Sequence, residues 1–422
     1  MKKAMILTSF MIAAAVALLP ACGIEPEEKD DMNTPKERTD IVLTKVQQQI
    51  GYNANAFTFD FLKAAAAKER EGKNIFVSPF SIQMALAMTA AGAAGDTQQE
   101  MYRALGFDGF SAEDVSEFYH TLIPALQDVD NTTVFEIANS FWSRKSILIK
   151  DEYQAGIKEN FFAEVYPLAD GPRQAAGEIN AWCSEKTHGM IDKIVDEVPE
   201  STIVSLLNAI YFKGMWSDKF SKSDNTQEKF TNRDGTTTQT TFMNQTFDRA
   251  RVYSDEYAEA MSLPYGNKAY SMTIVVPRGG ASLDKILAGL DTERWNAYRH
   301  GGDYYRAVFS MPKFEEEYAA EKLCIEILQD MGMQKAFTGA ADFSAMSDTP
   351  MCIDEIRHKA KIKVDEEGTE AAAVTYIGMR LTSVAPEHIE TFYFKADRPF
   401  LYFISEVSTG EILFAGVKNS VE

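Results

Sequence analysis

Residues 366–386 read EEGTEAAAVTYIGMRLTSVAP, and most of this stretch consists of small or apolar residues. Its first part holds small residues, one charge and no proline: Gly368, Thr369, Glu370, Ala371, Ala372, Ala373 and Val374. As an extended strand it would have one small-to-apolar face, formed by Thr369, Ala371, Ala373, Thr375, Ile377, Met379 and Leu381. Loop-forming residues stand at both ends of the stretch. A loop with the pattern of a half-buried strand suits a conformational switch, and an ordinary strand or helix is the alternative.

The N-terminus has the pattern of a targeting segment. Lys2 and Lys3 precede an apolar run over residues 4–19, which is short for a membrane span. The run ends in Pro20-Ala21-Cys22, and a small residue before a Cys resembles the lipobox of bacterial lipoproteins. That resemblance implies a signal peptide over residues 1–21 and a lipid anchor on Cys22, at the outer membrane or cell surface and therefore outside the cytoplasm. Pro20 departs from the usual lipobox, so cleavage by ordinary signal peptidase is the alternative.

The charge of the chain limits its partners. The 422 residues carry a formal net charge of -20, so no basic surface is expected to neutralise the phosphates of nucleic acid. Residues 22–38 are expected to form an acidic, flexible linker. The run at residues 27–31 is similar to acidic tags that direct some bacterial lipoproteins to the cell surface.

Hydrophobic patterning predicts interleaved helices and strands without a βαβ rhythm, hence a mixed α+β fold. Ser81 is expected to cap a helix over residues 82–91, and another helix is expected within residues 175–194. Residues 308–314 and 353–364 have the pattern of strands, and the second has His358 on its apolar face. Because Ser78, Ser81, Asn208 and His358 all fall in buried surroundings, each needs a hydrogen-bond partner. Three cysteines without metal-ligand spacing, Cys183, Cys324 and Cys352, are expected to be buried free thiols.

Signatures of enzymes are absent from the sequence. It has no G-x-S-x-G, no H-E-x-x-H and no phosphate-binding glycine-rich loop, and its five histidines have no metal-ligand spacing. A Ser–His pair formed by Ser78 or Ser81 with His358 would be buried away from substrate. We therefore expect no catalytic residues, no metal and no cofactor, and a hydrolase is the weakest of the hypotheses.

Six ordered motifs resemble the serpin family over nearly the whole chain from about residue 40. They are NIFVSPFSIQMALAMTAAGAAGDT (74–97), INAWCSEKTHGMIDKIV (179–195), LLNAIYFKGMW (206–216), SMPKF (310–314), IRHKAKIKVDEEGTEAAA (356–373) and FKADRPFLYFI (394–404). The resemblance implies one serpin domain over residues 39–422, with three β-sheets and eight or nine helices, in a monomer. It also implies that residues 366–386 are the exposed reactive-centre loop.

The same resemblance implies a suicide inhibitor of serine proteases, in which the cleaved loop enters the main sheet with the protease still attached as an acyl-enzyme. The mostly small hinge residues from Gly368 to Val374, together with Glu366, favour insertion over the alternative of a non-inhibitory serpin that only binds partners or is cleaved. Counted from Gly368 with the spacing usual in serpins, the resemblance implies a reactive bond at Thr382–Ser383, which would suit elastase-like or subtilisin-like enzymes. Arg380 would instead suit trypsin-like enzymes, and Leu381 or Met379 chymotrypsin-like or papain-like ones.

The resemblance also implies structural roles for the buried polar residues. Ser78, Ser81, Asn208 and His358 match a hydrogen-bonded cluster beneath the sheet that opens to admit the loop. Glu366 and Lys313 match an ion pair where the loop enters, and Trp216 matches a residue that packs there.

Overall fold

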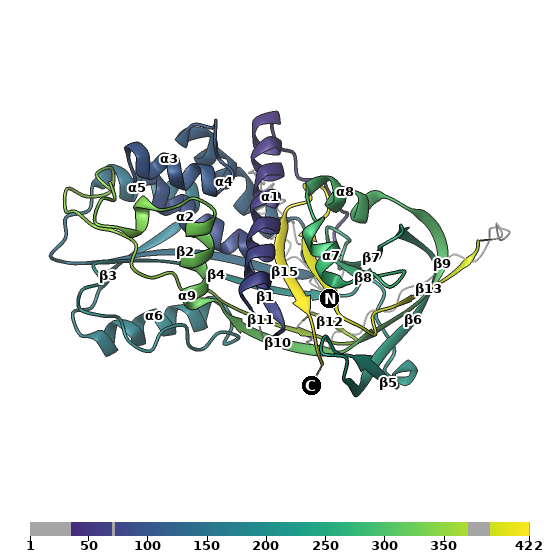
Figure 1. Ribbon diagram of the computed structural model, residues 1–422. Helices are drawn as coiled ribbons and strands as arrows, with labels where there is room; N and C mark the ends of the chain where they lie inside the picture. Colours follow the sequence, from purple (N-terminus) through teal and green to yellow (C-terminus); the bar gives the residue numbers. More distant parts are fainter. Residues whose placement is uncertain (1–34, 70–71, 370–388, 422) are drawn as a thin grey trace, which may run out of the picture. The chain divides into compact units, whose positions relative to one another are not determined.

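A six-stranded sheet forms the centre of the protein, and a computed structural model describes residues 35–69, 72–369 and 389–421 (Figure 1). The strands lie in the order β10 (Phe314–Ala319), β11 (Lys359–Val364), β12 (Gly368–Thr369), β4 (Val204–Met215), β2 (Thr133–Arg144) and β3 (Ala163–Leu168). Only β2 and β3 pair in parallel; the other neighbours are antiparallel. Figure 1 shows most helices above this sheet and α6 (Pro172–Lys186) below it.

A second network of nine strands follows the order β1-β15-β14-β8-β7-β6-β9-β13, with β5 also paired to β6. It comprises two sheets that share β6, because one part of that long strand pairs with β9 and its end pairs with β7. The bounds are β1 (Ile75–Val77), β5 (Thr226–Thr231), β6 (Thr237–Ser254), β7 (Ala258–Tyr265), β8 (Tyr270–Pro277), β9 (Asp303–Pro312), β13 (Thr391–Lys395), β14 (Phe400–Glu406) and β15 (Ile412–Lys418).

Besides α6, the described residues form eight further α-helices and two short 3-10 turns. The helices are α1 (Lys45–Lys68), α2 (Pro79–Ala91), α3 (Gly95–Ala104), α4 (Ala112–Asp128), α5 (Asp151–Phe161), α7 (Leu283–Ala288), α8 (Thr292–His300) and α9 (Glu321–Asp330), and the turns are η1 (Lys222–Asp224) and η2 (Lys335–Phe337). The expected mixed α+β fold with three sheets and eight or nine helices is confirmed.

Helix α2 begins three residues earlier than the sequence predicts. Ser78, not Ser81, is its N-cap: the Ser78 side chain accepts a hydrogen bond from the backbone N–H of Ser81. Pro79 then occupies the first helical turn, where backbone N–H groups have no acceptor within the helix. The N–H that proline lacks therefore costs no hydrogen bond there. The proline therefore belongs to the start of the helix, which the expected range of 82–91 left out.

Helix α6 is shorter than the predicted range of 175–194. It ends at Lys186, and His188 and Gly189 follow with positive φ angles of 51° and 79°. Left-handed residues of this kind commonly terminate helices. The chain from 187 to 203 then runs without regular helix or strand to β4.

Two strand predictions were too long. The predicted strand over 308–314 breaks at Lys313, which separates β9 from β10. The alternating pattern of 353–364 becomes strand only from Lys359, although His358, Ala360, Ile362 and Val364 are all buried as expected. Residues 351–358 instead border a cavity.

The six-stranded sheet separates two apolar clusters. The larger includes α2, β14 and β15, while the smaller contains Trp182 and Cys183 of α6 packed on β2 and β4. Cys324 is buried as predicted, but the prediction was wrong for Cys352, which is exposed. No helix among the described residues is both long and apolar enough to cross a membrane.

Candidate functional site

The candidate site begins at β12, where Gly368 and Thr369 already lie between two longer strands. Gly368 pairs with Met215 and Thr369 with Gly214 of β4, while Thr369 also pairs with Val364 of β11. A Cβ atom on Gly368 would lie only 2.0 Å from the carbonyl oxygen of Gly214. The backbones can therefore approach this closely only because residue 368 is a glycine.

Aromatic packing holds β12 in place. Thr369 is 3% exposed and its hydroxyl lies 2.6 Å from the Tyr265 hydroxyl. The Trp216 ring stacks on Tyr265 with centroids 4.4 Å apart, and its indole nitrogen donates to the carbonyl of Asp365 at 2.8 Å. Trp216 thus packs beside the first loop residues, at the position that the resemblance implied.

A buried carboxylate fixes the chain just before β12. Glu366 is 2% exposed and lies 3.0 Å from the ammonium group of Lys313. Burial alone would raise the pKa of Glu366, but hydrogen bonds from Asn225 and from Lys313 outweigh it, so the pKa lies below its ordinary value. The predicted Glu366–Lys313 pair is therefore present, and Asn225 is a third member that the sequence did not indicate.

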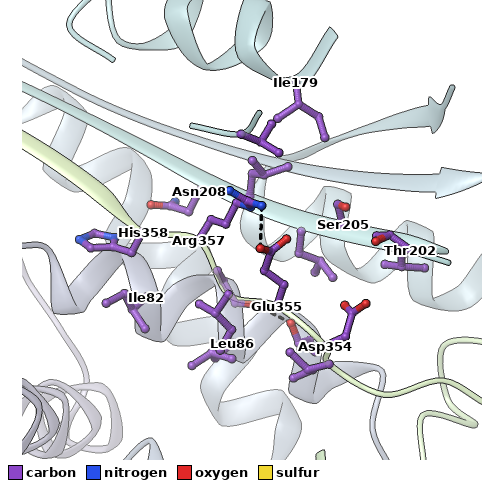
Figure 2. Close-up of a pocket in the computed structure, with 18 of the residues that line it drawn as sticks. Ile82, Leu86, Ile179, Thr202, Ser205, Asn208, Asp354, Glu355, Arg357 and His358 are labelled. Atoms are coloured by element: carbon purple, nitrogen blue, oxygen red, sulfur yellow. Dashed lines mark hydrogen bonds and ion pairs between the residues drawn. The ribbon is translucent and has the colours of Figure 1, made fainter. Parts of the chain in front are cut away.

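Beyond β12 the sheet is open. Among the described residues, no backbone pair joins β4 directly to β11, and β12 covers only the first positions between them. A cavity of about 140 Å³, which we call the cleft, continues between residues 204–208 of β4 and residues 351–358. Figure 2 shows Ile179 of α6 on one side of β4 and Ile82 and Leu86 of α2 on the other.

The far face of the cleft is covered by the segment after α6. Ile194, Val195 and Val198 line it, and the Lys359 ammonium group donates to the carbonyl of Lys193 at 3.3 Å. Arg357 and Glu355 form an ion pair of 2.7 Å within it (Figure 2).

His358 and Ser78 form a polar contact at the core side of the cleft. The Ser78 backbone N–H donates to His358 Nε2 at 3.0 Å, and the Ser78 hydroxyl donates to the carbonyl of Leu413 at 2.7 Å. Burial lowers the pKa of His358 to about 4, so the ring is neutral at pH 7 and carries its proton on Nδ1. The Ser78 hydroxyl donates its proton to the carbonyl of Leu413 and not to His358. Ser78 and His358 are therefore not arranged as a serine nucleophile and its general base.

Asn208 uses a different partner, Asn139 of β2, which the sequence analysis missed. The two residues lie opposite each other, and Asn208 Nδ2 donates to Asn139 Oδ1 at 2.7 Å. Asn139 in turn donates to the carbonyl of Phe161. Asn139 lies within the mostly apolar residues of β2, and a polar amide in such a run was the signal available in the sequence. Asn208 Oδ1 is buried and accepts no hydrogen bond from the described residues.

The structure therefore brings three of the four predicted cluster residues to one cavity: Ser81, Asn208 and His358 line the cleft, and Ser78 lies behind His358. The hinge from Glu370 to Val374, the bond Thr382–Ser383, its alternatives Arg380, Leu381 and Met379, and Cys22 fall outside the described residues. Within the described ranges, no group of three metal-ligating side chains is present.

Comparisons with known proteins agree with this geometry. The family model described as serpin (serine protease inhibitor) matches residues 52–420. Iripin-2 of Ixodes ricinus is 30% identical over 418 residues, covering 97% of this chain and 98% of that protein. An uncharacterised serpin-like protein of Thermococcus kodakarensis is 34% identical over 379 residues, which cover 89% of this chain and 87% of that protein.

Among solved structures, the thermophilic serpin tengpin in its native state superposes with a TM-score of 0.79 at 28% identity, covering 92% of this chain and 97% of that one. A family model that spans most of the sequence, relatives that align almost end to end and a shared fold lead to one conclusion: the chain belongs to the serpin family.

Proposed function

We propose that this serpin is a suicide inhibitor of serine proteases, and that its loop is cleaved and then inserts into the cleft between β4 and β11. The observation that carries the proposal is β12 itself. Gly368 and Thr369 already pair with β4, and Thr369 pairs with β11 as well, while no described strand occupies the space beyond them. Insertion then extends an existing strand, which avoids the unfavourable step of starting one.

Continuing the register of β12 gives each loop residue a definite neighbour. Glu370 would lie opposite Lys213 of β4 and Lys363 of β11, so its carboxylate would sit between two cations. Thr375 would lie opposite Asn208 and His358. Its hydroxyl would then reach the polar groups on the core side of the cleft, where Asn208 Oδ1 lacks a donor among the described residues.

The apolar residues further along the loop match the rest of the cleft. In the same register, Ile377 and Met379 of the inserted loop would face the side lined by Leu86, Phe343 and Met346. Burying each such side chain stabilises the inserted state by roughly 1.5–3 kcal/mol. Insertion through Thr382 would carry a tethered protease roughly 45 Å, at about 3.3 Å per residue.

The loop composition supports an elastase-like or subtilisin-like target cleaving at Thr382–Ser383, and Arg380 provides a second bond for trypsin-like enzymes. Leu381 or Met379 would serve chymotrypsin-like or papain-like enzymes, including cysteine proteases. The N-terminal pattern supports lipid anchoring through Cys22 at a bacterial cell surface, with residues 22–38 as a spacer before a monomeric inhibitor.

Incubation with elastase, subtilisin and trypsin, followed by denaturing gels and mass spectrometry, tests the proposal. We expect an adduct that survives denaturation and a released C-terminal fragment beginning at Ser383. Fully cleaved serpin beside fully active protease, with every enzyme tested, would show that the protein does not inhibit them by this route.

A further inference from the structure

The first described residues, 35–41, form neither helix nor strand, and we call them the strap. The Lys36 ammonium group forms an ion pair of 3.0 Å with Asp128, the last residue of α4, and also donates to its carbonyl. Arg38 Nη1 donates at 3.1 Å to the carbonyl of Lys268, in the turn between β7 and β8. The strap therefore connects two parts of the fold that lie 92 and 230 residues away from it in sequence.

The turn between β7 and β8 determines the position of Tyr265, whose hydroxyl contacts Thr369 in β12. The backbone N–H of Lys268 donates to the carbonyl of Tyr265 at 2.7 Å, which closes the turn. The N–H of Gly266 donates to the carbonyl of Met215 at the end of β4, at 2.8 Å. The strap therefore contacts the same closed turn that carries the partner of Thr369.

The connection from α4 to β2 joins the strap to the same place from the other side. The Lys36 backbone N–H donates to Asn131 Oδ1 at 2.9 Å. The neighbouring Asp130 is 2% exposed and accepts a hydrogen bond of 3.2 Å from the N–H of Asn267 in the turn. Strand β2 then begins, and its first residue pairs with the same residue of β4 as Thr369 does. The strap thus bridges two connections that meet at β12.

The strap can brace the turn because it is also fixed at its other end. The Ile41 backbone N–H donates to the Ser408 hydroxyl at 2.9 Å, and α1 begins at Lys45. The side chains of Lys36 and Arg38 are 30% and 31% exposed. Partly exposed ion pairs of this kind add little to the stability of a whole fold, so their effect is expected to be local.

We propose that Lys36 and Arg38 are positioning residues for loop insertion, because they fix the turn from which Tyr265 holds Thr369 in the sheet. This inference rests on the proposed function, in which the cleaved loop extends β12. Without the two strap contacts, Thr369 leaves the sheet more often, and the cleaved loop must start its strand anew. Water then hydrolyses more of the acyl-enzyme before the loop has entered the sheet.

Three variants test this role. Lys36→Ala/Arg38→Ala removes both side-chain contacts, while Lys36→Arg/Arg38→Lys keeps a cationic donor at each position. The control is Lys68→Ala, which removes an ion pair of 2.8 Å with Asp330 on α9 from a side chain of similar exposure, 27%.

Two quantities are measured. The first is amide hydrogen exchange in the intact protein, followed by mass spectrometry of a peptide covering residues 364–369. The second is the ratio of adduct to cleaved serpin on denaturing gels, with a protease that forms adducts with the wild type. The rate constant for loss of the intact loop is the reference, because no strap contact between described residues involves the loop beyond Thr369.

We expect the double alanine variant to exchange about threefold faster in residues 364–369 and to form adduct in an about threefold lower ratio, with loop loss at the wild-type rate. The conservative variant and the control should match the wild type in both quantities. Unchanged exchange, an equal change in the control, a lack of rescue, or faster exchange without a lower ratio would each overturn the positioning role. A wild type that forms no adduct with any protease would contradict the proposed inhibition, while the exchange measurement would still test whether the strap positions Thr369.

Discussion

At the scale of single residues, two buried titratable groups are held in their neutral forms by opposite pKa shifts. Burial lowers the pKa of His358 to about 4, so the fold loses stability as pH falls from about 6.5 towards 4. Burial, and secondarily the nearby Glu406, raise the pKa of Glu411 to about 8. Both groups are neutral at pH 7 because the apolar interior disfavours charge.

Glu411 leads to a prediction for alkaline solutions. It lies at the turn before β15, against Gly51 of α1 and close to Phe118 and Tyr119 of α4, with Glu406 as its charged neighbour. Because its pKa in the fold lies above the unfolded value, the stability from its neutral form is complete below about pH 4.5 and is lost as pH rises through 8. Glu411→Gln should therefore raise the unfolding temperature at pH 9 and have little effect at pH 5. Scanning calorimetry at one fixed scan rate checks this, and an equal shift at both values of pH would contradict it.

At the scale of elements, β12 is the decisive strand, although it contains only two residues. Thr369 is enclosed by β4, β11 and Tyr265. Thr369→Arg should exclude this position from the sheet and turn the inhibitor into a substrate, while Thr369→Ser keeps the hydroxyl and should inhibit normally. The fraction of serpin found as adduct on a denaturing gel measures the outcome. Equal adduct from both variants would show that insertion does not pass through this strand.

The register predicted for the inserted loop gives a second test. Reversing both cations, Lys213→Glu with Lys363→Glu, should place three carboxylates side by side and lower the adduct fraction severalfold. Adding Glu370→Lys to this double variant should restore the adduct fraction, because opposite charges are again adjacent. If the triple variant forms no more adduct than the double variant, the predicted register of the inserted loop is wrong.

The sequence predicted some of these elements well and others poorly, for physical reasons. Pairs that depend on side-chain type and family position, such as Glu366 with Lys313, were predicted, and the structure contains them. The Asn208–Asn139 pair depends on the register between β2 and β4, which local patterning does not contain. Residues 353–358 carry a strand pattern but form no strand, because the neighbour that would complete their hydrogen bonds is absent from the described sheet.

At the scale of the whole molecule, the proposed insertion requires the intact fold to be kinetically trapped rather than most stable. Within the described residues, β4 and residues 351–358 face each other across the cleft without pairing as strands, so their facing backbone groups have no ladder partner across it. Filling the cleft with a strand would satisfy those groups and bury apolar side chains.

Cleavage of the loop should therefore stabilise the protein. We expect the unfolding temperature to rise by tens of degrees after limited proteolysis within residues 379–383. The Thr369→Arg variant, cleaved in the same way, is the matched control. Its unfolding temperature should rise much less, since its loop cannot enter the sheet. Equal unfolding temperatures for the intact and cleaved wild-type protein would contradict a trapped fold.

The most direct measurement is the crystal structure of the loop-cleaved protein. We predict that residues 370–382 extend β12 into a long strand between β4 and β11, with Thr375 beside Asn208 and His358, so that the central sheet keeps six strands. A cleaved molecule in which these residues lie outside the sheet, with β4 and β11 still apart, would contradict the mechanism.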